Sequence, residues 1–289
     1  MNHSVAKPRI GVIGLGALGE PISALLLQAG YSIAVYDVRA EPMQKLQALG
    51  ATTCAHPAQL AQCSELIFSF VADAAQTQRV IAGESGILNH LRAGTVFATG
   101  STLGIDSVRQ CAQMLATQGS ELMDMPISGG IVAARAGQLS LMVGGAAETV
   151  ERLRPILTVF ASDITHTGGV GTGQAAKLAH QLVFGVQVVA LLEGLAVAAA
   201  GGVKPAIMRQ VLGQGLANSA VLQAWPDLGP RWKGMLQPLD EGMPLPNLRK
   251  DLHLVAALAQ RLGVATPLLT QASIIADSGT ATGSQDPDL

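Results

Sequence analysis

Hydrophobic positions follow two different patterns along this 289-residue chain. From residue 9 to about residue 167, short apolar runs rich in β-branched residues alternate with stretches whose apolar residues recur at helical spacing. The runs that predict strands are RIGVI, YSIAVY, ELIFSF, GTVFAT, ELMDM, LSLMVG and DITHT. Helices are expected between them, for example over residues 21–29, 42–49 and 105–117. This alternation predicts an α/β fold with a doubly wound, mostly parallel sheet.

The pattern changes after the glycine-rich stretch at residues 168–173, because strands no longer alternate with helices. The next predicted helix covers residues 172–200 and would be about 43 Å long at a rise of about 1.5 Å per residue. Further helices are predicted over residues 205–212, 248–262 and 266–276. We therefore expect two domains, an α/β domain at residues 1–167 and an all-helical domain at residues 168–289.

Charge is sparse in this chain, since charged residues make up only 13% of it, about half of the roughly 25% that is usual in soluble domains. We therefore expect part of the surface to be covered in a homodimer or homotetramer. The net charge is −2, and no cluster of Lys or Arg stands out. This argues against a nucleic-acid or membrane partner and favours a small molecule.

Three cysteines, Cys54, Cys63 and Cys111, are scattered without a Cys-x-x-Cys pair, so neither a metal site nor a disulfide framework is predicted. The N-terminal residues lead into the first strand pattern and lack the apolar core and cleavage site of a signal peptide. We expect a cytoplasmic protein. Residues 182–200 are apolar enough to raise the question of a membrane span, but a glutamine and a glutamate in the middle favour a buried soluble helix.

A glycine-rich turn follows the first predicted strand and opens a helix. Its sequence, GLGALG, has the G-x-G-x-x-G spacing typical of dinucleotide sites in Rossmann-type domains. The first glycine permits the tight turn, the second lets the backbone approach a pyrophosphate, and the third allows close packing of helix on strand. The residues predicted to bind the cofactor here are Gly14, Leu15, Gly16, Ala17, Leu18 and Gly19.

Asp37 lies at the end of the second predicted strand. A carboxylate at this place can accept hydrogen bonds from the adenosine ribose and would repel a 2′-phosphate, so NAD is the expected cofactor. Arg39 keeps NADP as the alternative, because its guanidinium could turn toward a 2′-phosphate.

Three motifs together resemble the β-hydroxyacid dehydrogenases, in particular 3-hydroxyisobutyrate dehydrogenases and their relatives. They are the opening GVIGLGALGEPISALLLQAG, DMPISGG at residues 124–130, and GTGQAAKLAHQ at residues 171–181. The resemblance spans nearly the whole chain. It implies hydride transfer between NAD(P) and a small β-hydroxy acid, with Lys177 as general acid and base. A lysine acts as a base only when its pKa falls from about 10.4 toward neutrality, as desolvation in a cleft would favour.

The same resemblance assigns substrate-binding and cofactor-binding residues. The SGG turn, with Ser128, Gly129 and Gly130, can hold a carboxylate because glycine allows close backbone approach. On the nicotinamide side the residues that match the family are Val71, Ala72, Gln76 and Thr102, and RKDL supplies Lys250 as a further cofactor contact.

His180 departs from the family pattern, because hydroxyisobutyrate-type enzymes carry an asparagine there. It follows Lys177 by three residues and therefore shares its helix face. We expect His180 to contact the substrate, and the K-x-x-H-Q form resembles the branch that acts on four-carbon sugar acids such as threonate and erythronate. Two further departures from the family pattern are smaller. Ala72 stands where the family usually has a proline, and Thr99 with Gly100 stands where it often has an acidic residue.

Other classes of protein fit the sequence less well. Neither tyrosine is placed for the Tyr-x-x-x-Lys pair of short-chain dehydrogenases, and the decarboxylating 6-phosphogluconate dehydrogenases are much longer. Imine reductases resemble this chain in architecture but usually replace the lysine. The alternative that stays open is a non-catalytic NAD(P)-binding sensor or scaffold of the same fold, since fold alone does not give function.

Overall fold

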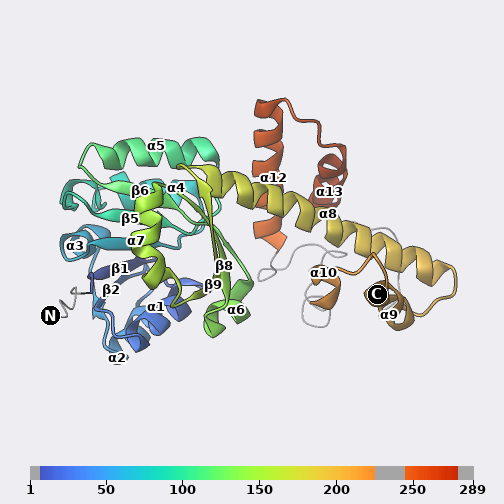
Figure 1. Cartoon of the computed structure of the whole chain (residues 1–289), viewed down its shortest axis with the longest axis horizontal. Helices are drawn as coiled ribbons and strands as arrows, with labels where there is room; N and C mark the ends of the chain where they lie inside the picture. The colour runs from blue at the N-terminus through green and yellow to red at the C-terminus, as the bar shows by residue number, and fades with distance from the viewer. Residues whose placement is uncertain (1–6, 225–244, 279–289) are drawn as a thin grey trace. The chain divides into compact units, whose positions relative to one another are not determined.

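The computed structural model describes residues 7–224 and 245–278. It divides into two compact units, Met1–Lys177 and Leu178–Leu289 (Figure 1). The expected domain boundary after residue 167 stays a prediction, because the border between the units falls inside a long helix.

The first unit contains one sheet with the order β3-β2-β1-β4-β5-β6-β8-β7, to which β9 adds beside β8. Its strands are β1 (Ile10–Ile13), β2 (Ile33–Tyr36), β3 (Thr52–Thr53), β4 (Leu66–Ser69), β5 (Val96–Thr99), β6 (Glu121–Asp124), β7 (Ile127–Ser128), β8 (Leu139–Gly144) and β9 (Ala161–Gly168). Neighbouring strands run parallel except where β8 meets β6 and β7. The predicted doubly wound, mostly parallel sheet is confirmed.

Helices cover both faces of this sheet. They are α1 (Gly19–Gln28), α2 (Ala40–Ala48), α3 (Pro57–Gln62), α4 (Ala74–Ala82), α5 (Ile105–Ala116), α6 (Gly130–Ala136) and α7 (Ala147–Leu157), with a 3-10 turn at Leu88–His90. One core joins α1, α6 and α7 to the sheet, and a second core joins α3, α4 and α5 to its other face. Because both faces are covered, β1, β4 and β5 are buried along their whole length. This explains why these strands are continuous apolar runs in the sequence.

Two strands, β3 and β7, could not be predicted from the hydrophobic pattern. Each has only two residues, too few to display a period, and each includes a hydroxyl residue. Their place is set by backbone pairing with β2 and with β8.

The second unit is helical, as predicted. Its helices are the major part of α8 (Thr172–Ala200), α9 (Pro205–Gln214), α10 (Ala220–Gln223), α12 (Leu245–Leu262) and α13 (Pro267–Ser278). Two small apolar clusters hold it together, one around Val188 and Leu195 and one around Leu178 and Leu252.

Helix α8 is the one helix in the described part of the chain that is long and apolar enough to cross a membrane, by length and composition only. Core helices of soluble proteins pass the same test. Only 22% of its most apolar window is buried within the chain. The described residues therefore leave most of this window exposed.

Candidate cofactor and active site

A cavity of about 640 Å³ opens in the first unit beside the ends of β1, β2 and β4. Six of the predicted cofactor residues line it, namely Gly14, Gly16, Asp37, Val71, Ala72 and Gln76. The lining also contains residues that the sequence did not single out, among them Val38, Pro57, Phe70, Arg79 and Ser85. The volume suits a small-molecule site. The structure therefore brings half of the predicted cofactor residues around one cavity.

The glycines of the turn have distinct steric roles. Gly14 has a φ of +85°, and a Cβ on Gly19 would come within 1.9 Å of the Gly14 carbonyl oxygen. By contrast, nothing lies within 4 Å of a Cβ built on Gly16. The first and third glycines are thus required by the fold itself. The second leaves open space above the backbone, which fits the approach of a pyrophosphate to the start of α1.

Asp37 is buried and holds the turn in place. Its Oδ2 accepts the backbone N–H of Leu15 at 2.6 Å, and its Oδ1 accepts the backbone N–H of Arg39 at 2.9 Å and the Arg39 Nε–H at 3.0 Å. Burial raises the pKa of this carboxyl, but the hydrogen bonds from Arg39 and Leu15 outweigh it, so the pKa lies below its usual value. Asp37 therefore lines the cavity as an ionised carboxylate.

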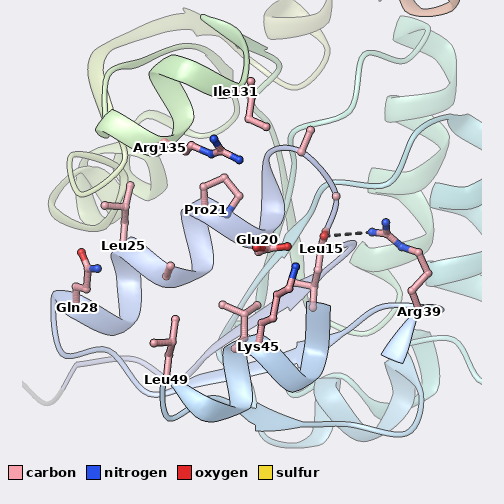
Figure 2. A pocket seen from close by; sticks show the side chains of 14 residues that line it. Leu15, Glu20, Pro21, Leu25, Gln28, Arg39, Lys45, Leu49, Ile131 and Arg135 are labelled. Atoms are coloured by element: carbon pink, nitrogen blue, oxygen red, sulfur yellow. Dashed lines mark hydrogen bonds between the residues drawn. The ribbon is translucent and has the colours of Figure 1, made fainter. Parts of the chain in front are cut away.

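A second pocket lies on the other side of the same turn, between α1, α2 and α6 (Figure 2). The predicted residues Leu15, Gly16 and Ala17 reach it. Arg39 lies at its edge, where its Nη2 donates to the Leu15 carbonyl oxygen at 3.2 Å, the dashed line in Figure 2. Leu18 directly precedes α1 as its N-cap residue.

Lys177 is buried near the start of α8, with 7% of its surface exposed. The start of this helix is fixed by Asp124, the last residue of β6. Asp124 accepts the backbone N–H of Gly171 at 2.7 Å and that of Gln174 at 2.8 Å. The carboxyl is fully buried, and burial raises its pKa despite these hydrogen bonds.

The SGG turn connects β7 to α6. Gly129 and Gly130 have φ values of +120° and +67°, which L side chains rarely adopt. Both glycines are exposed and Ser128 is half-buried. The turn therefore needs its two glycines, and a Cβ built on Gly130 would meet nothing within 4 Å. Thr102 lies half-buried in the loop after β5.

In the second unit, His180 and Lys250 lie at the two ends of a polar chain. His180 Nδ1 is 3.1 Å from Gln181 Oε1, Gln181 Nε2 donates to Asp251 Oδ2 at 2.8 Å, and Lys250 Nζ is 3.1 Å from Asp251 Oδ1. Gln181 and Asp251 are buried. Sequence reasoning missed both residues, although each is adjacent to a predicted one.

Two family matches together cover nearly the whole chain. Residues 9–168 match the NAD-binding domain of 6-phosphogluconate dehydrogenase, and residues 171–289 match the NAD-binding region of NADP-dependent 3-hydroxyisobutyrate dehydrogenase.

Individual relatives agree with these matches. A 2-(hydroxymethyl)glutarate dehydrogenase of Eubacterium barkeri is 30% identical over 97% of this chain and 92% of its own length. An L-threonate dehydrogenase of Cupriavidus necator is 31% identical over 73% of this chain and 71% of its own length. The solved structure of Mycobacterium tuberculosis 3-hydroxyisobutyrate dehydrogenase with L-serine has a TM-score of 0.81 at 25% identity, covering 94% of each chain. Three relatives thus carry three different substrate names.

Proposed function

This chain belongs to the β-hydroxyacid dehydrogenase family, the NAD(P)-dependent 3-hydroxyisobutyrate dehydrogenase-like oxidoreductases, and on that premise we propose Lys177 as its general acid and base. The observation that carries this proposal is the burial of Lys177 at a helix start that Asp124 anchors to the end of β6. Removing water from an ammonium group favours its neutral form, which can accept a hydroxyl proton. A bound NAD(P) would supply the hydride acceptor.

The substrate proposal is a small β-hydroxy acid, either 3-hydroxyisobutyrate-like or a four-carbon sugar acid. The two exposed amides of Gly129 and Gly130, with the Ser128 hydroxyl, would bind its carboxylate. His180 in the K-x-x-H-Q pattern supports the sugar-acid branch, because an imidazole can hydrogen-bond an additional hydroxyl. The similarity to the L-threonate dehydrogenase points the same way.

NAD is the proposed cofactor, with NADP as the alternative. Asp37 keeps a negative charge beside the cavity, which would repel a 2′-phosphate, while Arg39 is already hydrogen-bonded to that carboxylate. Replacing Arg39 with alanine should then leave the preference for NAD over NADP unchanged or increased.

The decisive experiment compares the wild type with a Lys177→Met variant. Reduced-nicotinamide absorbance would be followed with NAD or NADP and a panel of 3-hydroxyisobutyrate, glycerate, threonate and erythronate. We expect kcat to fall about 100-fold or more in the variant, the usual contribution of a general acid or base, while NADH binding by fluorescence is retained. Lys204→Met, at an exposed position, is the matched control and should keep full activity.

Two other results would count against the proposal. Full turnover by the Lys177→Met variant would remove the lysine from the reaction. The sensor or scaffold alternative would be favoured if the wild type binds the cofactor but neither oxidises any of the acids nor reduces the matching aldehydes and ketones.

We further propose a homodimer or homotetramer in the cytoplasm. Support comes from α8, where Val183 and Val197 are 56% and 74% exposed in the single chain although the helix is strongly apolar. Covering such side chains by a second copy would stabilise both. Sedimentation showing only monomers at micromolar concentration would contradict the oligomer, and cell fractionation tests the location.

A further inference from the structure

Gln174 uses both ends of its side-chain amide to join α8 to the loop after β5. Its Oε1 accepts the backbone N–H of Leu103 at 2.7 Å, and its Nε2 donates to the Ser101 carbonyl oxygen at 3.0 Å. The side chain is fully buried. These hydrogen bonds flank Thr102, which lies between the two bonded residues.

The hydrogen bonds continue on either side of Gln174. Its own backbone N–H donates to Asp124 at the end of β6, and the Ser101 hydroxyl donates to the Val71 carbonyl oxygen in the segment after β4. A continuous polar path therefore links the ends of β4, β5 and β6 to the first turn of α8. Lys177 lies one helical turn after Gln174 on this same helix.

Glutamine is the side chain that this place requires. A buried amide group must satisfy both its donor and its acceptor, because an unpaired polar group away from water is destabilising. Here one end meets an N–H and the other a carbonyl oxygen, so an ionised glutamate would lack the donor and methionine would lack both functions. The position therefore requires a side chain with both a hydrogen-bond donor and an acceptor, and not only one of the right size.

We propose that Gln174 is a positioning residue of the dehydrogenase reaction. It fixes Val71 and Thr102, on the nicotinamide side, relative to the helical turn that carries Lys177. This rests on the function proposed above. Misplacement of reacting groups by about 1 Å can cost about 100-fold in rate, so the loss of this link should act on kcat rather than on cofactor affinity.

The first test replaces Gln174 with methionine, which has a similar length. We expect kcat to fall about 10- to 100-fold while the Kd for NADH changes by less than about 3-fold, and hydrogen exchange at the Leu103 amide to accelerate. Thr149→Val is the control, because it removes a different side-chain hydrogen bond of a buried residue in the same unit, the one from the Thr149 hydroxyl to Glu121. It should keep kcat.

The second test uses Gln174→Glu, which can restore both hydrogen bonds when its carboxyl is protonated. A protonated glutamic acid has a hydroxyl donor and a carbonyl acceptor and can rebuild both hydrogen bonds. The activity of this variant relative to wild type, compared at each pH, should therefore rise as the pH falls. Urea midpoints followed at the same pH values distinguish this recovery of activity from a recovery of folding.

The proposal is overturned if Gln174→Met keeps wild-type kcat, or if the Gln174→Glu activity ratio does not depend on pH. Failure of the proposed function would look different, because it would appear as full activity in Lys177→Met or as no turnover by the wild type.

Discussion

Two glycine-rich loops in the first unit are each held by a buried carboxylate at the end of a strand. Asp37, directly after β2, accepts the Leu15 N–H of the loop before α1, and Asp124, at the end of β6, accepts the Gly171 N–H of the loop before α8. The carboxylates differ in what surrounds them. Asp37 lies beside a cavity and pairs with Arg39, whereas Asp124 is enclosed by backbone and has no exposed surface.

The pKa values of these two carboxyls move in opposite directions. At both, burial is the largest influence and raises the pKa. The hydrogen bonds from Arg39 and Leu15 reverse this at Asp37, but the backbone N–H bonds from Gly171 and Gln174 do not reverse it at Asp124. The comparison indicates that a neighbouring cation keeps the carboxylate at the cavity ionised, as the proposed contact with a ribose would require. Enclosure by amides suits one that anchors a helix.

The largest difference in stability is expected between variants that remove the anchoring carboxylate of Asp124 and the cavity carboxylate of Asp37. Asp124→Ala leaves two buried amides without an acceptor, and we expect a loss of about 3 kcal/mol in the free energy of unfolding, measured with urea. Asp37→Ala should cost about 1 kcal/mol, because water in the cavity can replace the carboxylate. Asp124→Asn, which keeps one acceptor, should fall between them. Equal losses for the two alanine variants would contradict the distinction.

The next largest difference is expected from glycine substitutions in the loop before α1 and at the start of α8. A Cβ on Gly173 would lie 2.4 Å from the Met142 carbonyl oxygen and 2.8 Å from Asp124 Oδ2, whereas one on Gly16 meets nothing within 4 Å. Gly173→Ala should therefore lower stability by about 2 kcal/mol. Gly16→Ala should unfold like the wild type but weaken NADH binding about 10-fold or more, because the methyl group would occupy the proposed path of the pyrophosphate. Unchanged NADH affinity in Gly16→Ala would count against the placement of the cofactor.

The smallest effect is expected from Arg39→Ala, as a change in how the stability depends on pH. A lowered folded-state pKa means that Asp37 contributes stability above its unfolded pKa, near 3.8, and that this contribution is lost as the pH falls through the folded value. Without Arg39 the folded pKa rises, so the variant should lose stability at a higher pH on acidification than the wild type. Urea midpoints across the acid range test this. Coincident profiles would mean that the exposed guanidinium contributes little.

Parts of the site that depend on neighbouring residues could be predicted from the sequence. The glycine spacing at residues 14–19 specifies a turn within a few residues, and Asp37 follows a strand that pairs in parallel with β1. The partnership of Gln174 could not be predicted in this way. Its amide binds Leu103 and Ser101, which are 71 and 73 residues away along the chain. A glutamine on an apolar helix gives no sign of which distant loop it meets.

The sequence by itself determined the longer strands of the sheet unit and the alternation of helices with them, the helical character of the second unit, and the motifs that identify the family. These features are local, because periodicity and turn chemistry depend on residues close together in the chain. Tertiary structure decided the two-residue strands β3 and β7, the enclosure of Asp124, and the link from Gln174 to the loop after β5. Each of these depends on backbone groups from distant segments that meet only after the strands have paired.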